Sequence, residues 1–303
     1  MTEVILGTAI IVVLVVGLAS GLLSARSWLV PDGGIDVTVN DTLHLVARRG
    51  DKLLSVLHNS GIRIPAACGG TGTCGLCRVT VTGQGAGEPQ ATERGVLSPK
   101  ERRERMRLAC QTSLRGDCAV TVPDDILSAG GGFTCTVSST RMLAPLIREI
   151  IFHLPEDQRS GFRAGDFMQI TAPTFRFDFS TLELPCEFHE TWKTAGWRDL
   201  EVASDTEVTR AYSLASRPED SGLAVFNIRL AVPPAGRERD VPPGLVSSWL
   251  FSLKPGDTAD LSGPFGDFHV QPTDRQMVFV GGGVGMAPLR AMIHQELGRG
   301  TKR

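Results

Sequence analysis

Four cysteines have the types and spacing of a metal centre. Cys68, Cys74 and Cys77 lie in one glycine-rich stretch, AACGGTGTCGLCRV, and Cys110 follows further along the sequence. Soft thiolate ligands favour iron–sulfur clusters or zinc. The glycines allow the backbone to fold tightly around a buried anion with its N–H groups turned inward. We therefore expect these four residues to ligate a [2Fe–2S] cluster.

A structural zinc site is the alternative for these cysteines. Zinc sites more often pair two C-x2-C knuckles, and only one such knuckle is present. The plant-type ferredoxin spacing C-x4-C-x2-C differs from C-x5-C-x2-C by a single residue, which favours the cluster. Cys118, Cys135 and Cys186 have no partner at ligand spacing, so we expect them to be small buried hydrophobic residues.

Two polar motifs further along the sequence could bind a phosphate-bearing cofactor. The first is RAYS, with Arg210, Tyr212 and Ser213 on a predicted strand. The second, GLVSS, is expected to open a helix, where free N–H groups and the helix dipole favour a phosphate. Simple N-capping is the alternative for Ser247 in this motif.

A glycine-rich turn, GGGVGMAP, follows the apolar run Met277–Val280, which is predicted to be a strand. A helix is expected from Pro288 to Leu297. The turn has the form G-x-G-x-x-P instead of G-x-G-x-x-G, and its glycines would admit a dinucleotide pyrophosphate at the helix N-terminus. A tight packing turn is the alternative. The residues expected to contact NADH are Gly281, Gly282, Gly283, Gly285 and Pro288.

The ordered set RxYS, GxxSS, GPFG and GGGVGMAP resembles the ferredoxin–NADP reductase superfamily. The resemblance implies that Arg210 contacts the FAD pyrophosphate, that Tyr212 packs on the isoalloxazine and that Ser213 approaches flavin N5. Tyr212 and Ser213 are thus the implied catalytic residues. The GxxSS backbone would hold the FAD pyrophosphate through Gly244, Ser247 and Ser248.

The elements that must position these motifs predict an α+β multidomain protein. Short alternating strands and one helix over residues 35–126 indicate a small α+β domain. With its cysteine spacing, this domain resembles a plant-type [2Fe–2S] ferredoxin of β-grasp type. Recurrent short strands over 130–270 favour an antiparallel barrel or sandwich, with an inserted loop at 183–205. The superfamily resemblance implies the barrel, as an FAD-binding domain. Residues 271–303 would begin a doubly wound α/β NAD domain. That lobe needs on the order of 100 residues, so we expect it to be incomplete and the protein to be truncated at its C-terminus.

Residues 4–23 carry no charge and would span about 30 Å as a helix, so we predict a transmembrane anchor over 1–24. A cleaved signal peptide is the alternative, but the short, acidic start Met1–Glu3 lacks its basic region. Basic residues follow the segment and none precedes it. The positive-inside rule therefore places the rest of the protein in the cytoplasm, where thiols stay reduced.

The overall composition narrows the function classes. The sequence has 303 residues, with 31 Lys and Arg against 33 Asp and Glu and a formal charge of −2. This balance argues against a nucleic-acid partner, which requires a basic face. Seven cysteines in 303 residues are too few for a disulfide scaffold.

An anchor followed by ferredoxin, FAD and NAD modules resembles the F subunit of the Na+-translocating NADH:quinone oxidoreductases. The resemblance rests on the cysteine spacing, the stretches CGGTGTCGLCRV and RLACQT, and the insertion at 183–205. It implies an enzyme subunit of a bacterial inner membrane, single-pass, with its soluble domains on the cytoplasmic side. Electrons would pass from NADH to FAD, to the [2Fe–2S] cluster and to partner membrane subunits, which reduce quinone and export Na+.

Two other functions stay open at this point. The first is a membrane-anchored reductase component of an oxygenase, which shares the FAD and NAD modules. The second is an electron carrier without NADH activity of its own, which the short C-terminal lobe favours. The electron acceptor separates the first from the implied function, and a test of NADH oxidation separates the second.

Overall fold

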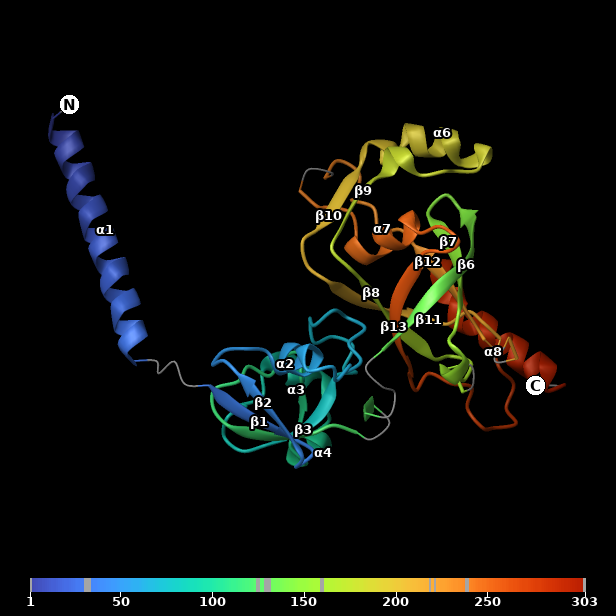
Figure 1. The fold of residues 1–303 in the computed structure, drawn as a ribbon, viewed down its shortest axis with the longest axis horizontal. Helices are drawn as coiled ribbons and strands as arrows, with labels where there is room; N and C mark the ends of the chain where they lie inside the picture. Colours follow the sequence, from blue (N-terminus) through green and yellow to red (C-terminus); the bar gives the residue numbers. More distant parts are fainter. Residues whose placement is uncertain are drawn as a thin grey trace.

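The structure is a computed structural model that describes residues 2–29, 34–123, 126–127, 132–158, 161–217, 219–220, 222–237 and 240–301. Helix α1 (Thr2–Leu29) stands apart from two β-sheet modules that lie next to each other (Figure 1). No helix within the described residues has the length and apolar character needed to cross a membrane. The boundary predicted at residue 130 lies outside the described residues.

The first module is a five-stranded sheet with the order β2-β1-β5-β3-β4. Only the β1–β5 pair is parallel. In β1, Ile35, Val37 and Val39 are buried whereas the residues between them face outward, which is the period-2 pattern of a half-buried strand. The strands are β1 (Ile35–Val39), β2 (Leu43–Ala47), β3 (Arg78–Thr82), β4 (Met106–Leu108) and β5 (Cys118–Thr121).

Three short helices cover this sheet. Helix α2 (Leu53–Asn59) buries Leu53, Val56 and Leu57 against it, and Gly61 continues the backbone at φ +85° just after the helix. Capping boxes start both α3 (Ala91–Val96) and α4 (Pro99–Arg103). Cys118 is buried in this module, as expected.

The second module is an antiparallel six-stranded sheet with the order β11-β8-β13-β6-β7-β12. An isolated bridge between Leu214 and Phe226 joins its two end strands, so the sheet curls into a barrel, as predicted. Helix α7 (Leu245–Ser252) packs against β8 and β11. The strands are β6 (Phe133–Ala144), β7 (Ile147–His153), β8 (Phe167–Ala172), β11 (Val208–Ser213), β12 (Leu223–Arg229) and β13 (Thr258–Phe265).

The segment 183–205 is not the loop that its weak periodicity suggested. It forms α6 (Cys186–Thr194), the short 3-10 helix η3 (Trp197–Asp199) and β10 (Glu201–Ser204), which pairs with β9 (Phe175–Asp178). Trp192 explains why this segment forms regular structure. It is fully buried, and its indole N–H donates to the Pro145 carbonyl at 2.7 Å. One tryptophan therefore anchors a helix whose other residues are mostly polar and exposed.

Cys186 corrects a second expectation, because it is exposed at the start of α6 instead of buried. Cys135 in the barrel is 1% exposed, as predicted for a small core residue. The difference follows from the elements: Cys135 lies on the inward face of β6, whereas Cys186 is the first residue of α6 and is exposed there. Two further 3-10 turns, η1 (Glu156–Gln158) and η2 (Phe179–Thr181), complete the barrel module.

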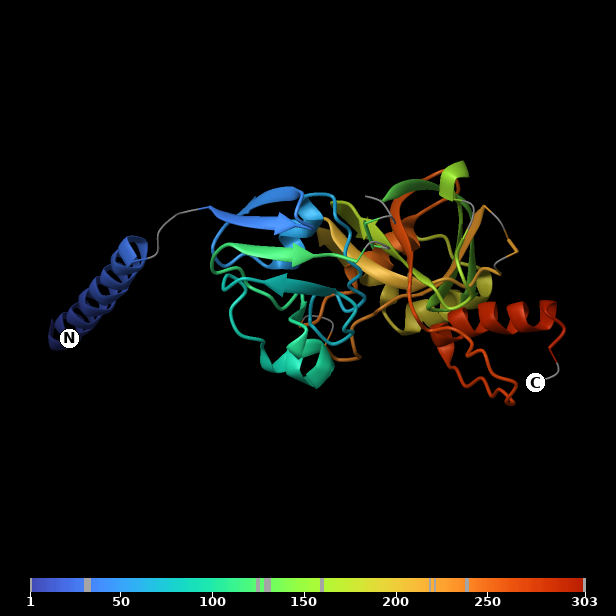
Figure 2. The same cartoon turned by 90° about the horizontal axis from the view of Figure 1, so that it is seen from below.

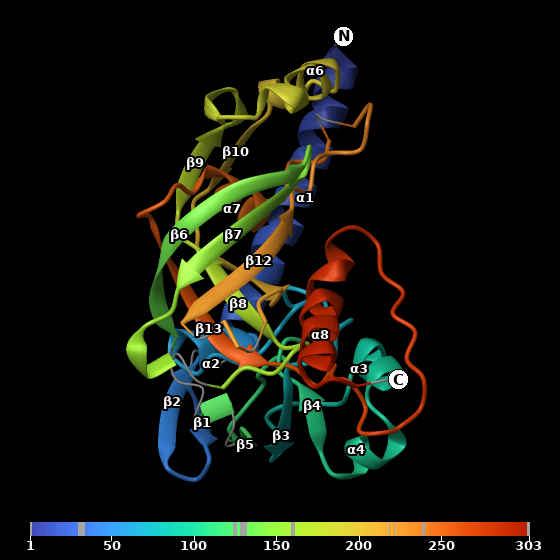
Figure 3. The ribbon, with the colours of Figure 1, turned by 90° about the vertical axis from the view of Figure 1, so that its right-hand side faces the viewer.

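The C-terminal part differs from its prediction in one element. The turn η4 (Gly283–Gly285) and helix α8 (Met286–Gly298) are present, and α8 lies alongside the barrel (Figure 3). Met277–Val280 does not form a strand, and Val278 and Val280 are 86% and 87% exposed. A strand forms by pairing, and no strand among the described residues pairs with this run.

Candidate cluster and flavin sites

The four cysteines lie as two pairs in the first module. The Cys74 thiol donates to Cys68 Sγ at 3.4 Å, and the Cys77 thiol donates to Cys110 Sγ at 3.3 Å. Cys68 and Cys74 lie in the loop before β3, Cys77 directly precedes β3, and Cys110 follows β4. The β3–β4 pairing continues through a bond from the Ala109 N–H to the Cys77 carbonyl at 2.8 Å. That bond places Cys110 next to Cys77.

Within each cysteine pair, the two thiols differ in the direction in which their pKa is shifted. Burial opposes ionisation of Cys68, but the Thr71 hydroxyl and nearby backbone N–H groups lower the pKa of its thiol to about 5. Burial raises the pKa of Cys74. The hydrogen bond from Cys77 lowers the pKa of Cys110 to about 7, while the same bond and burial raise the pKa of Cys77. One thiol of each pair is therefore poised to bind a metal ion as thiolate.

The donor set fits a two-iron cluster. A [2Fe–2S] cluster takes two protein thiolates on each iron. The pairs Cys68–Cys74 and Cys77–Cys110 match that division.

Glycines and one amide shape the loop around the cysteines. Gly70, Gly72 and Gly75 have φ values of +92°, +84° and +68°, which L side chains rarely adopt. The Gln111 amide donates to the Gly70 carbonyl at 2.9 Å and to Cys110 Sγ at 3.5 Å. A side chain at Gly72 would collide with Gln111, since a Cβ there would lie 2.8 Å from its Cδ.

A buried ion pair, which the sequence motifs did not reveal, supports Cys110. Glu93 is fully buried and accepts hydrogen bonds at 2.9 Å from Arg107 Nε and Nη2 and from the Leu108 N–H. Burial opposes its ionisation, but the Arg107 and backbone bonds hold the pKa of Glu93 below its usual value. The pair fixes the end of β4 just before Cys110. Glu93 as the final residue of a capping box was its only sequence signal.

Four of the six predicted flavin residues line a pocket of about 330 Å³ in the second module. β11 supplies Arg210 and Tyr212, and the start of α7 supplies Gly244 and Ser247. Burial raises the pKa of the Tyr212 hydroxyl, so this ring stays neutral and apolar against the pocket. The full lining is Val208, Arg210, Ala211, Tyr212, Arg229, Ala231, Gly244, Leu245, Val246 and Ser247.

Ser213 and Ser248 do not line this pocket. Ser213 ends β11, and Ser248 is fully buried with its hydroxyl donating to the Gly244 carbonyl at 2.8 Å. The Ser247 hydroxyl donates to the same carbonyl at 3.0 Å. Both hydroxyls are thus used inside the helix, and the groups free for a phosphate are the backbone N–H groups of the first turn of α7.

Arg229 is a pocket residue that the sequence motifs missed. It ends β12 on the same pocket as Arg210, so two guanidinium groups line a site at a helix N-terminus. This charge arrangement fits a pyrophosphate. No local motif surrounds Arg229; only the pairing of β12 into the barrel brings it there.

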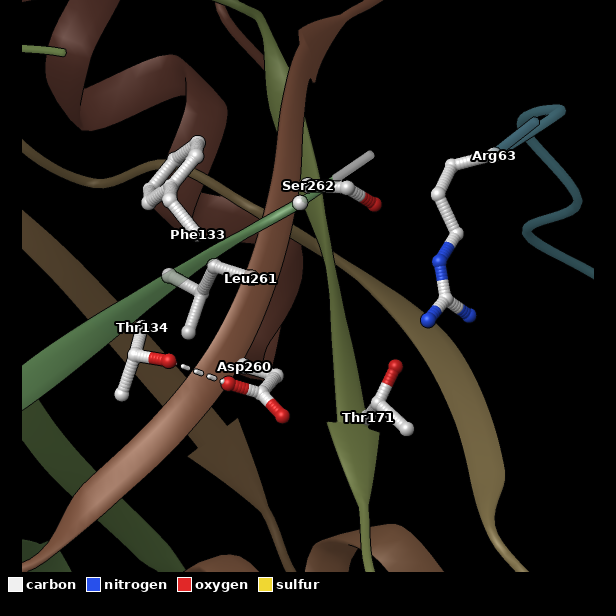
Figure 4. Close-up of a pocket in the computed structure, with 8 residues that line it drawn as sticks. Arg63, Phe133, Thr134, Thr171, Asp260, Leu261 and Ser262 are labelled. Atoms are coloured by element: carbon white, nitrogen blue, oxygen red, sulfur yellow. Dashed lines mark hydrogen bonds between the residues drawn. The ribbon is translucent and has the colours of Figure 1, made fainter. Parts of the chain in front are cut away.

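The cluster loop and the flavin strand are in contact. Gly69, next to Cys68, lies so close to Arg210 that a Cβ on it would be 2.6 Å from the guanidinium carbon. The two modules lie side by side with this loop facing the barrel (Figure 2). A separate polar cavity of about 190 Å³ lies on the same side, where Arg63 reaches toward Thr171 across from Asp260 (Figure 4).

Comparisons with known proteins agree with this division of sites. A profile of the 2Fe-2S iron-sulfur cluster binding domain matches residues 37–115, and a profile of the oxidoreductase FAD-binding domain matches residues 192–270. The F subunit of the Na(+)-translocating NADH-quinone reductase of Idiomarina loihiensis is 40% identical over 301 residues, covering 99% of this protein and 73% of the relative. The F subunit of Neisseria meningitidis serogroup B is 42% identical over 297 residues, covering 98% and 73%. This protein belongs to the F-subunit family of Na+-translocating NADH-quinone reductases.

Solved structures add likenesses to reductases. An Amycolatopsis cytochrome P450 reductase has a TM-score of 0.49 at 25% identity, over 89% of this protein and 70% of that one. The ferredoxin reductase in carbazole 1,9a-dioxygenase has a TM-score of 0.45 at 23% identity, over 86% and 70%. The two domain profiles indicate a [2Fe–2S] cluster and FAD as the cofactors of this member of the F-subunit family.

The predicted nicotinamide turn lies apart from the flavin pocket of this F-subunit family member. Gly283 and Gly285 form η4 at the start of α8, and Pro288 lies in its first turn, where a missing N–H is tolerated. Gly281 packs tightly, since a Cβ would lie 2.7 Å from Leu289 and Met286. Gly282 has open space around it. None of the predicted NADH residues lines the flavin pocket or the nearby apolar pocket between 268 and 280.

Proposed function

We propose that this protein is the NADH-oxidising, electron-input subunit of a Na+-translocating NADH:quinone oxidoreductase. Electrons enter at FAD, pass to the [2Fe–2S] cluster and leave to partner subunits. One observation carries the order of the cofactors: the loop that holds Cys68 touches the strand that holds the flavin residues, through Gly69 and Arg210. FAD, when bound, takes a hydride from NADH as an electron pair and releases electrons singly to the one-electron cluster.

The residue roles follow from the two sites. Cys68 and Cys74 would hold one iron, and Cys77 and Cys110 the other. Arg210 and the first turn of α7, from Gly244 through Ser247 and Ser248, would bind the FAD pyrophosphate. Tyr212 would cover the isoalloxazine, and Ser213 would approach N5. Gly281, Gly282, Gly283, Gly285 and Pro288 would receive the NADH pyrophosphate.

The proposed units follow the predicted boundaries. Residues 1–24 form an anchor, 35–126 the ferredoxin domain, 130–270 the FAD barrel and 271–303 the first part of an NAD domain. The two sheets with their separate cores support the division between the second and third units. Helix α8, which packs on the barrel through Ala287, supports a connection between the last two.

The proposed setting is the inner membrane of a bacterium. The uncharged stretch 4–23 supports attachment to membrane lipid, with the soluble units on the cytoplasmic side. Other membrane subunits of the complex would accept the electrons, reduce quinone and move Na+. Fractionation of cells that express the protein with and without residues 1–24 tests the attachment. Recovery of both forms in the soluble fraction would refute it.

The central test is an anaerobic titration of the full-length protein with NADH, recorded in the visible range. We expect the flavin and cluster absorbance to fall together. A protein that responds to dithionite and not to NADH would refute direct NADH oxidation. That outcome would favour the second candidate, an electron carrier without NADH activity, which the unpaired run Met277–Val280 supports.

A further inference from the structure

Gln169 connects the barrel to the cluster loop. It lies in the middle of β8, which is flanked by β11 and β13, and only 1% of it is exposed. In the β8–β11 register it faces Ala211, between the flavin residues Arg210 and Tyr212. A polar side chain this deeply buried requires partners for its amide.

The partners of this amide belong to the first module. Gln169 Oε1 accepts the Ala66 N–H at 3.0 Å, and Gln169 Nε2 donates to the Ile64 carbonyl at 3.4 Å. The Ala66 carbonyl then accepts the Gly69 N–H at 3.1 Å, which closes a turn that contains Cys68. Hydrogen bonds thus connect β8, which pairs with the flavin strand β11, to the turn that contains Cys68.

We propose that Gln169 is the positioning residue that fixes the distance between flavin and cluster. The inference rests on the proposed function, because it concerns electron passage between those two sites. One amide both accepts from and donates to backbone groups two residues apart, so it defines one orientation of the loop. A shorter or purely apolar side chain cannot meet both requirements.

A polar cavity of about 190 Å³ lies beside this contact. It is lined by Arg63, next to Ile64, and by Asp260 and Thr171 on the barrel (Figure 4). Thr171 is two residues from Gln169 along β8, so the Gln169 bonds lie directly beside a region where the two modules are not packed against each other.

The experiment compares the Gln169→Leu variant with the wild-type protein, both with all 303 residues. A light pulse with a deazaflavin photoreductant delivers one electron to the protein, and opposite absorbance changes of the flavin and cluster bands, as that electron redistributes between them, report the electron transfer. Amide hydrogen exchange of the peptide that contains Ala66 reports the loop. We expect the exchange rate to rise, because a buried N–H loses its acceptor. We expect the electron-transfer rate to fall by about tenfold, because positioned groups tolerate little displacement. Cluster and flavin content should stay unchanged.

Gln169→Glu keeps the test decisive if the leucine variant fails to fold. At pH 8 the carboxylate can only accept, so it repels the Ile64 carbonyl. At pH 6 protonation, which burial favours, restores a donor. We expect the electron-transfer rate of this variant to recover toward the wild-type rate as the pH falls. A general structural defect would not recover in this way.

Gln158→Leu and Gln158→Glu are the matched controls, because Gln158 is half-buried in a short 3-10 turn and, among the described residues, its side-chain amide donates to Asp157 of the same turn. They should leave exchange and electron transfer unchanged. An electron-transfer rate within twofold of wild type in Gln169→Leu, or unchanged exchange at Ala66, would overturn the proposal. The light pulse bypasses NADH, so a failure of NADH to reduce the flavin would count against the proposed function alone.

Discussion

Both the cysteine loop and the glycine turn before α8 can be recognised as motifs in the sequence. In the structure, the segments that flank the two motifs differ in how they pair. Around the cysteines, strands β3, β4 and β5 pair with one another, and the four thiols lie in two close pairs. Around the glycines, the preceding apolar run Met277–Val280 pairs with no strand of the described residues, and its Val278 and Val280 are exposed. A motif is positioned by the pairing of its flanking elements, because an isolated strand has no partner for its backbone groups.

The largest expected effect is loss of the cluster in Cys110→Ala. Without this thiolate the iron paired with Cys77 lacks a ligand, so we expect iron content and the cluster absorbance to be lost, with FAD retained. Cys186→Ala is the control, since Cys186 is exposed on α6 in the other module. Full iron content in Cys110→Ala would show that the pairing assigned here is incorrect.

Glu93→Gln should lower the free energy of unfolding by about 3–5 kcal/mol, because it leaves the buried Arg107 guanidinium without its counter-charge. Urea denaturation followed by circular dichroism measures this change. Glu104→Gln, which alters an exposed residue, should stay within about 0.5 kcal/mol of wild type. Equal losses in both variants would contradict the role of Glu93 under Cys110.

The same pair predicts a pH dependence. The Arg107 and backbone bonds overcome burial and depress the folded-state pKa of Glu93, so its contribution to stability is complete above the unfolded value of about 4.3. It declines as the pH falls from there toward the lower folded-state pKa. Unfolding measured between pH 7 and pH 3 should show a decline that Glu93→Gln lacks. Parallel curves for the two proteins would refute it.

Two valines test the comparison directly. Val79 lies in β3 and is 1% exposed, whereas Val278 lies in the run predicted to be a strand and is 86% exposed. Val79→Ala should cost about 2 kcal/mol of unfolding free energy, and Val278→Ala should cost less than about 0.5 kcal/mol. A comparable cost at Val278 would mean that residues 276–280 are paired in solution.

The smallest effect distinguishes two glycines with similar backbone angles. Gly69 has φ +63° and lies against Arg210, while Gly283 has φ +54° and open space. Alanine at either position should cost about 1–2 kcal/mol of strain. Only Gly69→Ala should also displace Arg210, and we expect its FAD dissociation constant to rise about tenfold. Equal FAD affinity in both variants would show that the contact between Gly69 and Arg210 does not contribute to FAD binding.

The sequence predicted most strands from their alternation, and Ile35, Val37 and Val39 show why: alternate burial leaves a local pattern. It failed at 183–205, where the order depends on one buried residue, Trp192, and its long-range bond to Pro145. It also missed Arg229 and Glu93, which act through partners that lie far away along the sequence. Such residues carry no local pattern to recognise.

The amino-acid sequence by itself determined the chemistry: four thiolates at ferredoxin-like spacing and an ordered set of flavin motifs. Residue type and short spacing are local properties, and they fix which cofactors the protein can bind. Only the tertiary structure decided how the cysteines pair, which groups line the flavin pocket and how the two sites meet. Gln169 and Ala66 are separated by 103 residues, and their bond exists because β8 is the barrel strand that faces the cluster loop.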